Sequence, residues 1–158
     1  MNEIVAMNKQ YAKKIATWKY EGVYDVYSFE DDAEAMRELL NGDYYVSVTP
    51  DGEIHGFYCF GTSAQIPTKE DKVYRHTALD FGLGMRPDLC GKGLGRRFVR
   101  EGIAFAERKF HAKQIRLSVA SFNQRAIRTY ESEGFQRIKS MTHAKSNNTF
   151  YMMVCVLT

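Results

Sequence analysis

The sequence predicts a mixed α/β fold in one domain over residues 1–158, and three observations lead to it. A chain of 158 residues is long enough to bury a sizeable core but short for two independent domains. Strand-like and helix-like segments alternate along it, with neither an internal repeat nor a linker. Its composition, 44% hydrophobic and 26% charged, is typical of a folded globular protein rather than a disordered one.

The N-terminal third is predicted as a strand, a helix and a loop. Glu3–Met7 is a short strand. Asn8 then begins an amphipathic helix whose apolar residues recur at spacings of four and three, at Tyr11, Ile15 and Trp18. Residues 18–32 contain five aromatic and five acidic residues without a clean period. Most of that stretch is therefore predicted to be a loop.

A helix and a hairpin are predicted next. Asp31 or Asp32 caps a helix that runs through Leu40, and Asn41-Gly42 ends it because glycine adopts the left-handed conformation without strain. Tyr44–Thr49 and Ile54–Phe60 are strands on either side of Pro50-Asp51-Gly52. This turn favours an antiparallel hairpin.

The second half of the chain alternates strands with helices. Thr77–Met85 is a long strand that Pro87 stops. Apolar residues near helical spacing predict a helix from Leu94 to about Phe110, and Gln114–Ala120 alternates as a strand does. The remaining predicted elements are a helix capped by Asn123 and ended by Gly134, and two strands near Phe135–Met141 and Thr149–Leu157.

Composition excludes several classes of protein. The longest apolar run, Phe150–Leu157, is too short for a membrane-spanning helix, and no secretory signal opens the chain. Three cysteines are an odd number, and Cys59 and Cys155 lie in apolar runs, so a reducing cytoplasm is expected. A net charge of +3 without a basic stripe predicts no nucleic-acid partner, and no metal site is predicted.

The most informative stretch lies between a strand and a helix and contains Gly91, Gly93 and Gly95. Alternate glycines let backbone N–H groups converge on an anion, and the following helix N-terminus favours negative charge. A phosphate or pyrophosphate site is therefore predicted, with a flexible turn as the alternative. The spacing fails for an ATP or GTP loop, because Arg86 and Gly93 occupy its key places, and Arg96 disfavours a nicotinamide fingerprint. A nucleotide-binding module without coenzyme A remains a weaker alternative.

The strand before this loop alternates sharply in side-chain size. Leu79, Phe81, Leu83 and Met85 would face one way. Asp80, Gly82 and Gly84 would face the other and open a slot beside the backbone. Close approach of a ligand is favoured, and a bulge or a tightly packed neighbour is the alternative.

These residues resemble the GNAT superfamily of N-acetyltransferases, which use acetyl-CoA. Two motifs carry the resemblance: Leu83-Gly84-Met85-Arg86-Pro87 leading into Gly91-Lys92-Gly93-Leu94-Gly95, and Asn123 through Phe135. The resemblance implies a mixed, mostly antiparallel central sheet flanked by helices. It also implies that backbone amides from Gly91 to Arg96 hold the pyrophosphate of coenzyme A and that Leu83–Met85 run beside its pantetheine arm.

Cys90, which belongs to the same implied cofactor site, departs from the family pattern of Gln or Arg at its position. Affinity is expected to survive because the grip is mostly backbone N–H, and a nucleophilic role for this thiol is disfavoured. Asn123 is a helix cap, and by resemblance it also contacts the cofactor arm. Tyr130 is either a core tyrosine or, with the motif in place, the acid that protonates the departing thiolate of coenzyme A.

As a mechanism, the sequence predicts direct attack of an amine on the acetyl thioester, whose carbonyl a backbone N–H of Leu83–Met85 polarises. The amine must first lose a proton. Asp80 is the candidate base because it would share the slot with Gly82 and Gly84, although a bulge would reverse its facing. His76 is the runner-up, while His55, His111 and His143 have no identifiable partner.

The acceptor is predicted only as a class. By resemblance, the aromatic and acidic stretch from Trp18 to Asp32 lines the acceptor side, and such groups attract ammonium ions. A cationic small amine or a peptide N-terminus is expected, unless the stretch is a solvated loop. The alternative function is a sensor that binds acetyl-CoA or CoA without turnover. Phe150–Leu157 offers an edge for a homodimer or lies inside the sheet.

Overall fold

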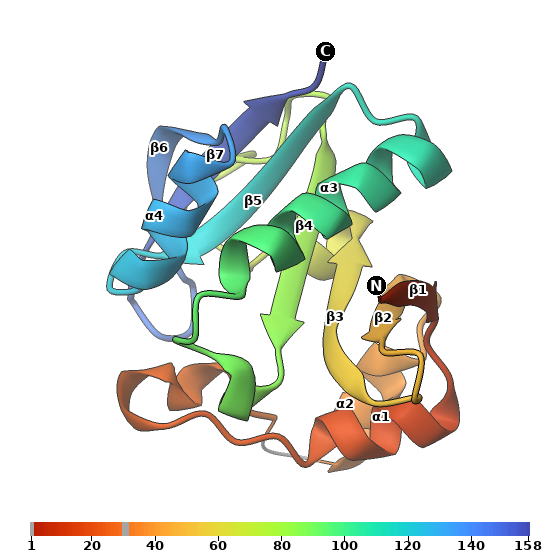
Figure 1. Cartoon of the computed structure of the whole chain (residues 1–158). Coiled ribbons are helices and arrows are strands. Elements are labelled where there is room, and N and C mark those ends of the chain that lie inside the picture. The colour runs from red at the N-terminus through yellow and green to blue at the C-terminus, as the bar shows by residue number, and fades with distance from the viewer. Residues whose placement is uncertain (1, 30–31) are drawn as a thin grey trace. The chain divides into compact units, whose positions relative to one another are not determined.

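The computed structural model describes residues 2–29 and 32–158 (Figure 1). Glu30 and the predicted cap Asp31 lie outside the described residues. The chain splits into two compact units. The first contains Met1–Cys59 and Leu83–Lys92, and the second contains Phe60–Gly82 and Gly93–Thr158. The prediction of a single domain stays a prediction.

Within the described residues the strands form one open, mostly antiparallel sheet in the order β1-β2-β3-β4-β5-β7-β6. The strands are β1 (Glu3–Ala6), β2 (Tyr44–Val48), β3 (Ile54–Phe60), β4 (Leu79–Met85), β5 (Gln114–Ala120), β6 (Gln136–Thr142) and β7 (Thr149–Val156). β4 and β5 run parallel, whereas β1 with β2, β2 with β3, β5 with β7 and β6 with β7 are antiparallel. The predicted fold class is confirmed.

The helices begin and end close to the predicted positions. They are α1 (Lys9–Ala16), α2 (Asp32–Leu39), α3 (Gly95–Phe110) and α4 (Gln124–Ser132). Short 3-10 turns cover Gly22–Tyr27 (η1), Gly61–Ala64 (η2) and Pro87–Leu89 (η3). One turn therefore lies inside the stretch that was predicted to be mostly loop. Within the described residues, no helix combines the length and apolar character that crossing a membrane requires.

The first unit places α1 and α2 with the strands β1, β2 and β3. The predicted start of α1 is confirmed, because the Asn8 side chain accepts a hydrogen bond from the backbone N–H of Tyr11 at 2.9 Å. Ile15 of α1 and Leu39 of α2 are fully buried. On β3, the ring of Phe57 packs against Trp18 and Tyr44, with centroid distances of 6.1 and 5.8 Å. This aromatic cluster fixes where the stretch after α1 begins.

The second unit buries β5 and β7 between two layers. Helices α3 and α4 lie on one side of these strands (Figure 1), and the buried residues of α3 include Phe98 and Phe105. A second apolar cluster contains Val73, Ala120, Met141, Phe150 and Met152. Ile66, Tyr74 and Phe122 pack against that cluster, so the segment before β4 contributes to the core of this unit.

Of the two alternatives left open for Phe150–Leu157, the structure shows the internal strand, and a homodimer stays a prediction. β7 pairs with β5 on one side and with β6 on the other, so its backbone groups are occupied within the sheet. A strand paired on both sides offers no ladder to a second chain. Among the described strands of this unit, β6 stands at the edge instead.

Candidate functional site

The segment that leads from β4 into the glycine loop is held rigidly. The guanidinium of Arg86 donates to both carboxylate oxygens of Asp88 at 2.6 and 3.1 Å. The same side chain donates to the carbonyl of Ile54 at 3.0 Å, and the Arg86 backbone N–H donates to the carbonyl of His55 at 2.9 Å. The loop therefore starts from a fixed point on β3.

The loop itself has the open backbone that an anion site needs. Gly91 and Gly93 have φ angles of 74° and 80°, in the left-handed region where a side chain is strained. Residues 91–94 are exposed, and a Cβ added at Gly93 would meet nothing within 4 Å. Lys92, between the two glycines, adds a positive charge. Glycine is thus needed at these positions for the backbone conformation, and at Gly93 it leaves the backbone open to a ligand.

The N-terminus of α3 lacks the side-chain cap that α1 and α4 have. Asn8 caps α1 and Asn123 caps α4 with their side chains, but Leu94 gives α3 no side-chain hydrogen bond, and its first turn has no acidic residue. The first helical bond of this 16-residue helix runs from Phe98 N–H to the Leu94 carbonyl at 3.1 Å. The N–H groups before Phe98 have no helical acceptor, and the helix dipole adds partial positive charge there. This end of α3 fits a phosphate group.

Glu133, at the end of α4, ties the first two turns of α3 to α4. Its carboxylate accepts from Arg96 Nε at 3.1 Å, and from Arg100 Nε and Nη2 at 3.0 and 3.1 Å. Beside this cluster, a Cβ on Gly95 would lie 3.5 Å from Thr129, so the two helices approach closely. Hydrogen bonds from Arg100 and Arg96 hold the pKa of Glu133 below its usual range. The Arg96 side chain is therefore engaged by Glu133. Its backbone N–H lies in the first turn of α3, before the first helical hydrogen bond.

We expect Glu133→Gln to lower the Tm at neutral pH. A carboxylate whose pKa is depressed in the folded state contributes stability above its unfolded pKa and loses it as pH falls through the folded pKa. The difference in Tm between wild type and Glu133→Gln should therefore shrink as pH is lowered from 7 to 3. Glu101→Gln, which removes the exposed pair with Arg97, is the matched control and should change the Tm less. A pH-independent difference would contradict the assignment.

Asn123 and Tyr130 both belong to α4. The Asn123 side chain accepts from the Ala126 backbone N–H at 3.2 Å, which confirms the predicted cap. Tyr130 is half-buried, and its ring meets Phe135 edge to face at 5.9 Å between centroids. Contacts of either side chain with a cofactor stay predictions.

The predicted slot beside Gly84 is closed. A Cβ on Gly84 would lie 2.5 Å from the ring of Phe57, so a packed neighbour fills the space that was assigned to a ligand. Leu83, Gly84 and Met85 nevertheless remain partly exposed to solvent. Cys90 is also half-buried, with its Sγ 3.8 Å from the Met85 carbonyl and 3.7 Å from that of Arg86. Gly84 therefore serves to seat Phe57 on β4.

The structure argues against Asp80 as a general base. Asp80 is 5% exposed, and both of its oxygens accept from the Arg116 guanidinium at 2.6 and 2.8 Å. Gln65 adds a third hydrogen bond at 2.8 Å, and Arg116 also donates to the His76 carbonyl at 2.9 Å. A carboxylate with these partners is shielded from water and poorly placed to take a proton from an amine. Alternation along β4 did not reveal this partner, because Arg116 lies on β5.

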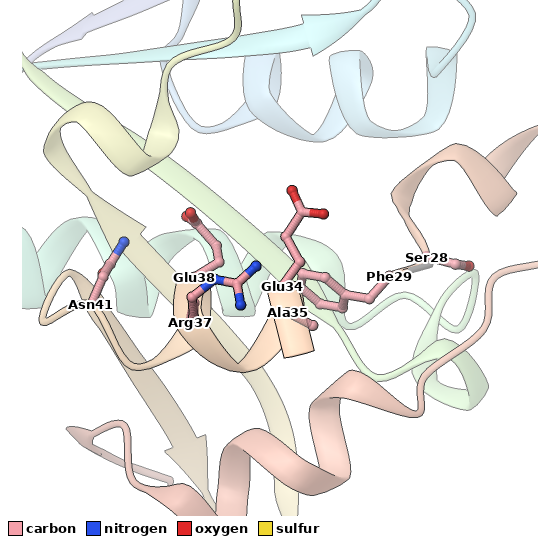
Figure 2. A pocket seen from close by; sticks show the side chains of 7 residues that line it. All are labelled: Ser28, Phe29, Glu34, Ala35, Arg37, Glu38 and Asn41. Carbon is pink, nitrogen blue, oxygen red and sulfur yellow. The ribbon is translucent and has the colours of Figure 1, made fainter. Parts of the chain in front are cut away.

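The stretch after α1 contributes to a hollow of about 530 Å³ in the first unit (Figure 2). The hollow lies where this stretch passes α2, and Ser28, Phe29, Glu34, Ala35, Arg37, Glu38 and Asn41 line it. Figure 2 shows the Phe29 ring beside Ala35, and Glu34 and Glu38 on α2 with Arg37 between them. Glu38 accepts a hydrogen bond from the Tyr44 hydroxyl at 2.6 Å. The lining is acidic and aromatic, with one compensating cation.

Together, the mixed sheet, the left-handed glycine loop and the uncapped helix define an α/β protein whose loop and helix end have the donors and partial charge that suit a phosphate group. The model of the acetyltransferase (GNAT) family matches residues 10–135, which is most of the chain. The chain belongs to that family, so the predicted membership is confirmed.

A curated relative supports the same family. The chain is 32% identical over 103 residues to the N-alpha-acetyltransferase RimI of Mycobacterium tuberculosis (strain ATCC 25618 / H37Rv). The match covers 65% of this chain and 58% of the relative, so the chain spans less than two thirds of the length of that protein.

Solved structures share the fold. A chimera of spermidine N-acetyltransferase SpeG from Vibrio cholerae and hSSAT has a TM-score of 0.76 at 16% identity, over 98% of this chain and 95% of the other. AAC(6')-Ib in complex with ribostamycin and coenzyme A has a TM-score of 0.75 at 18% identity, over 98% and 93%. At these identities the likeness concerns the fold.

Proposed function

We propose that this chain transfers an acetyl group from acetyl-CoA directly to a primary amine of a small molecule or of a peptide or protein N-terminus. The observation that carries the proposal is the uncapped N-terminus of α3 directly after two left-handed glycines. It offers backbone donors and partial positive charge to a diphosphate. The bound coenzyme A of AAC(6')-Ib, a protein with the same fold, agrees with this choice of ligand.

Three groups of residues would hold the cosubstrate. Backbone N–H groups of Gly91, Lys92, Gly93, Leu94, Gly95 and Arg96 would bind the pyrophosphate, beside Cys90. Leu83, Gly84 and Met85 would pair with the amide groups of the pantetheine arm, and Asn123 would contact the same arm. The rigid connection through Arg86 supports this assignment, because a fixed loop loses little conformational entropy on binding.

For the transfer step, acetyl-CoA supplies the acetyl thioester. The amine nitrogen forms a bond to the acetyl carbon while the bond from that carbon to sulfur breaks. A backbone N–H of Leu83–Met85 would donate to the thioester oxygen as negative charge develops there. Water would first take the proton that the ammonium group loses. Tyr130 would then donate its phenolic proton to the departing sulfur, and the second proton, released from the nitrogen as the amide forms, would restore the phenol. Asp80 is left out as a base because Arg116 and Gln65 occupy its oxygens.

A cationic amine is the acceptor class that we favour. Glu21 and Asp25 are exposed in the stretch after α1, and Phe29, Glu34 and Glu38 line the hollow beside it. Carboxylates and aromatic faces attract ammonium groups. The fold neighbours include enzymes named for spermidine, and the curated relative is named for N-terminal amines. Spermidine and the N-terminus of a peptide both have amino groups that are largely protonated at neutral pH.

The test is a transfer assay with spermidine, ribostamycin and a short peptide that has a free N-terminus. Blocking the N-terminus of the same peptide gives the matched control. Thiol detection measures the CoA that is released, and mass spectrometry measures the acetylated amine. We expect one CoA thiol per acetylated amine with at least one of the free amines, and no release with the blocked peptide. Binding of CoA without transfer to any of these amines would favour a CoA-binding sensor.

A further inference from the structure

Tyr20 joins the stretch after α1 to the end of β4. Its hydroxyl donates to the Met85 carbonyl at 2.7 Å. Two residues earlier, the Trp18 ring packs on Phe57, whose own ring fills the space over Gly84. Two neighbouring positions of β4 are thus linked to this stretch, Met85 directly through Tyr20 and Gly84 through Phe57, on which Trp18 packs. Those positions belong to the segment that we propose to run along the pantetheine arm.

Residues 19–29, here named the acceptor loop, form a closed unit of their own. Lys19 Nζ donates to the Phe29 carbonyl at 2.6 Å, and the Tyr20 backbone N–H donates to the Ser28 hydroxyl at 2.9 Å. The Tyr20 ring meets Tyr27 edge to face at 6.4 Å. These contacts tie both ends of the loop together around η1. The loop can therefore move as one body that carries Tyr20.

The Tyr20 hydroxyl remains a hydrogen-bond donor at neutral and mildly alkaline pH. Burial, with a smaller contribution from Cys90, raises the pKa of the Tyr20 phenol above its usual value. The phenol therefore stays protonated and donates. The Met85 carbonyl accepts this bond at the C-terminal end of β4, where the strand turns into the segment anchored by Arg86.

We propose that Tyr20 is a positioning residue that couples the acceptor loop to occupation of β4 by acetyl-CoA. The inference rests on the proposed function. A cosubstrate that lies along Leu83–Met85 restricts the end of β4, and the hydrogen bond from Tyr20 passes that restriction to residues 19–29. By linkage, an ordered acceptor loop also favours the bound cosubstrate.

The consequence for kinetics is specific. Tyr20→Phe keeps the ring and removes only the hydroxyl. At saturating acetyl-CoA, we expect the KM for an amine that the wild type acetylates to rise about tenfold, the effect of roughly one hydrogen bond, with a smaller change in kcat. Tyr11→Phe, a half-buried tyrosine of α1 in the same unit, is the control and should leave both constants unchanged.

Hydrogen exchange tests the coupling without turnover. Wild type, Tyr20→Phe and Tyr11→Phe are each measured with and without desulfo-CoA, which has no thioester, and Tm shifts report its binding. We expect desulfo-CoA to raise the Tm of all three proteins. It should slow amide exchange in residues 20–29 of the wild type and of Tyr11→Phe by about tenfold, and that protection should be absent in Tyr20→Phe.

Equal protection of the loop in wild type and Tyr20→Phe, or no protection in the wild type despite a clear Tm shift, would overturn the role of Tyr20 and leave the proposed function intact. No Tm shift in the wild type would overturn the proposed function, and the inference would fall with it.

Discussion

Tyr130→Phe is expected to lower kcat by about 100-fold or more, the usual contribution of a positioned general acid. The substitution removes the phenolic proton that would go to the departing sulfur. It keeps the ring, so the edge-to-face contact with Phe135 survives and the fold should not change. The measurement is steady-state thiol release at saturating acetyl-CoA with an amine that the wild type acetylates.

Binding provides the control for this variant. The Tm shift with desulfo-CoA should match that of the wild type, because the phenol acts on the leaving group and not on the pyrophosphate. If Tyr130→Phe keeps the full kcat, Tyr130 is a core residue and not the general acid. Loss of both kcat and the Tm shift would instead indicate a structural or binding role.

Asp80→Asn is expected to destabilise the protein by about 3–5 kcal/mol, the typical cost of removing one partner from a buried ion pair. The Arg116 guanidinium is 4% exposed and would lose its counter-charge without gaining water. Urea denaturation measures the change as a lower midpoint. The same variant should keep the pH dependence of kcat/KM, because Asp80 lies in a closed network and takes no proton from the amine.

A double variant separates charge from packing. Asp80→Leu with Arg116→Met replaces the pair by apolar groups and should recover much of the lost stability. A stable Asp80→Asn protein whose kcat/KM is much lower and no longer shows the pH dependence of the wild type would contradict our reading and restore Asp80 as the base.

Local sequence rules predicted most of the fold because its signals are local. Asn8 and Asn123 cap helices through bonds that span only three residues, and the hairpin from Tyr44 to Phe60 follows from its turn. The position of β7 between β5 and β6 depends on pairing between strands distant in sequence. An apolar run of that kind suits an edge or a central strand equally, so the sequence left both open.

The part of the candidate site that depends on backbone conformation, the glycine loop, was predictable from the sequence. Glycines at 91 and 93 indicated a loop whose backbone can approach an anion, and the structure adds that both adopt the left-handed conformation. Side-chain roles that depend on a remote partner were not predictable. Alternation on β4 could not reveal that Phe57 fills the space over Gly84 or that Arg116 occupies Asp80. Glu133 lies within the motif from Asn123 to Phe135, and its partners Arg96 and Arg100, four residues apart on one helix face, are the signal in the sequence that could have indicated the cluster.

We propose above all that the glycine loop and the uncapped N-terminus of α3 bind coenzyme A. The most direct measurement is the Tm with acetyl-CoA, desulfo-CoA, ATP and NAD, each in large excess. A ligand at about 100 times its Kd adds about 2.7 kcal/mol to the free energy of unfolding. For a chain of this size, the Tm should then rise by about 5 °C or more. We expect that rise with the two CoA compounds alone, and a larger shift with ATP or NAD, or none with any ligand, would contradict the account.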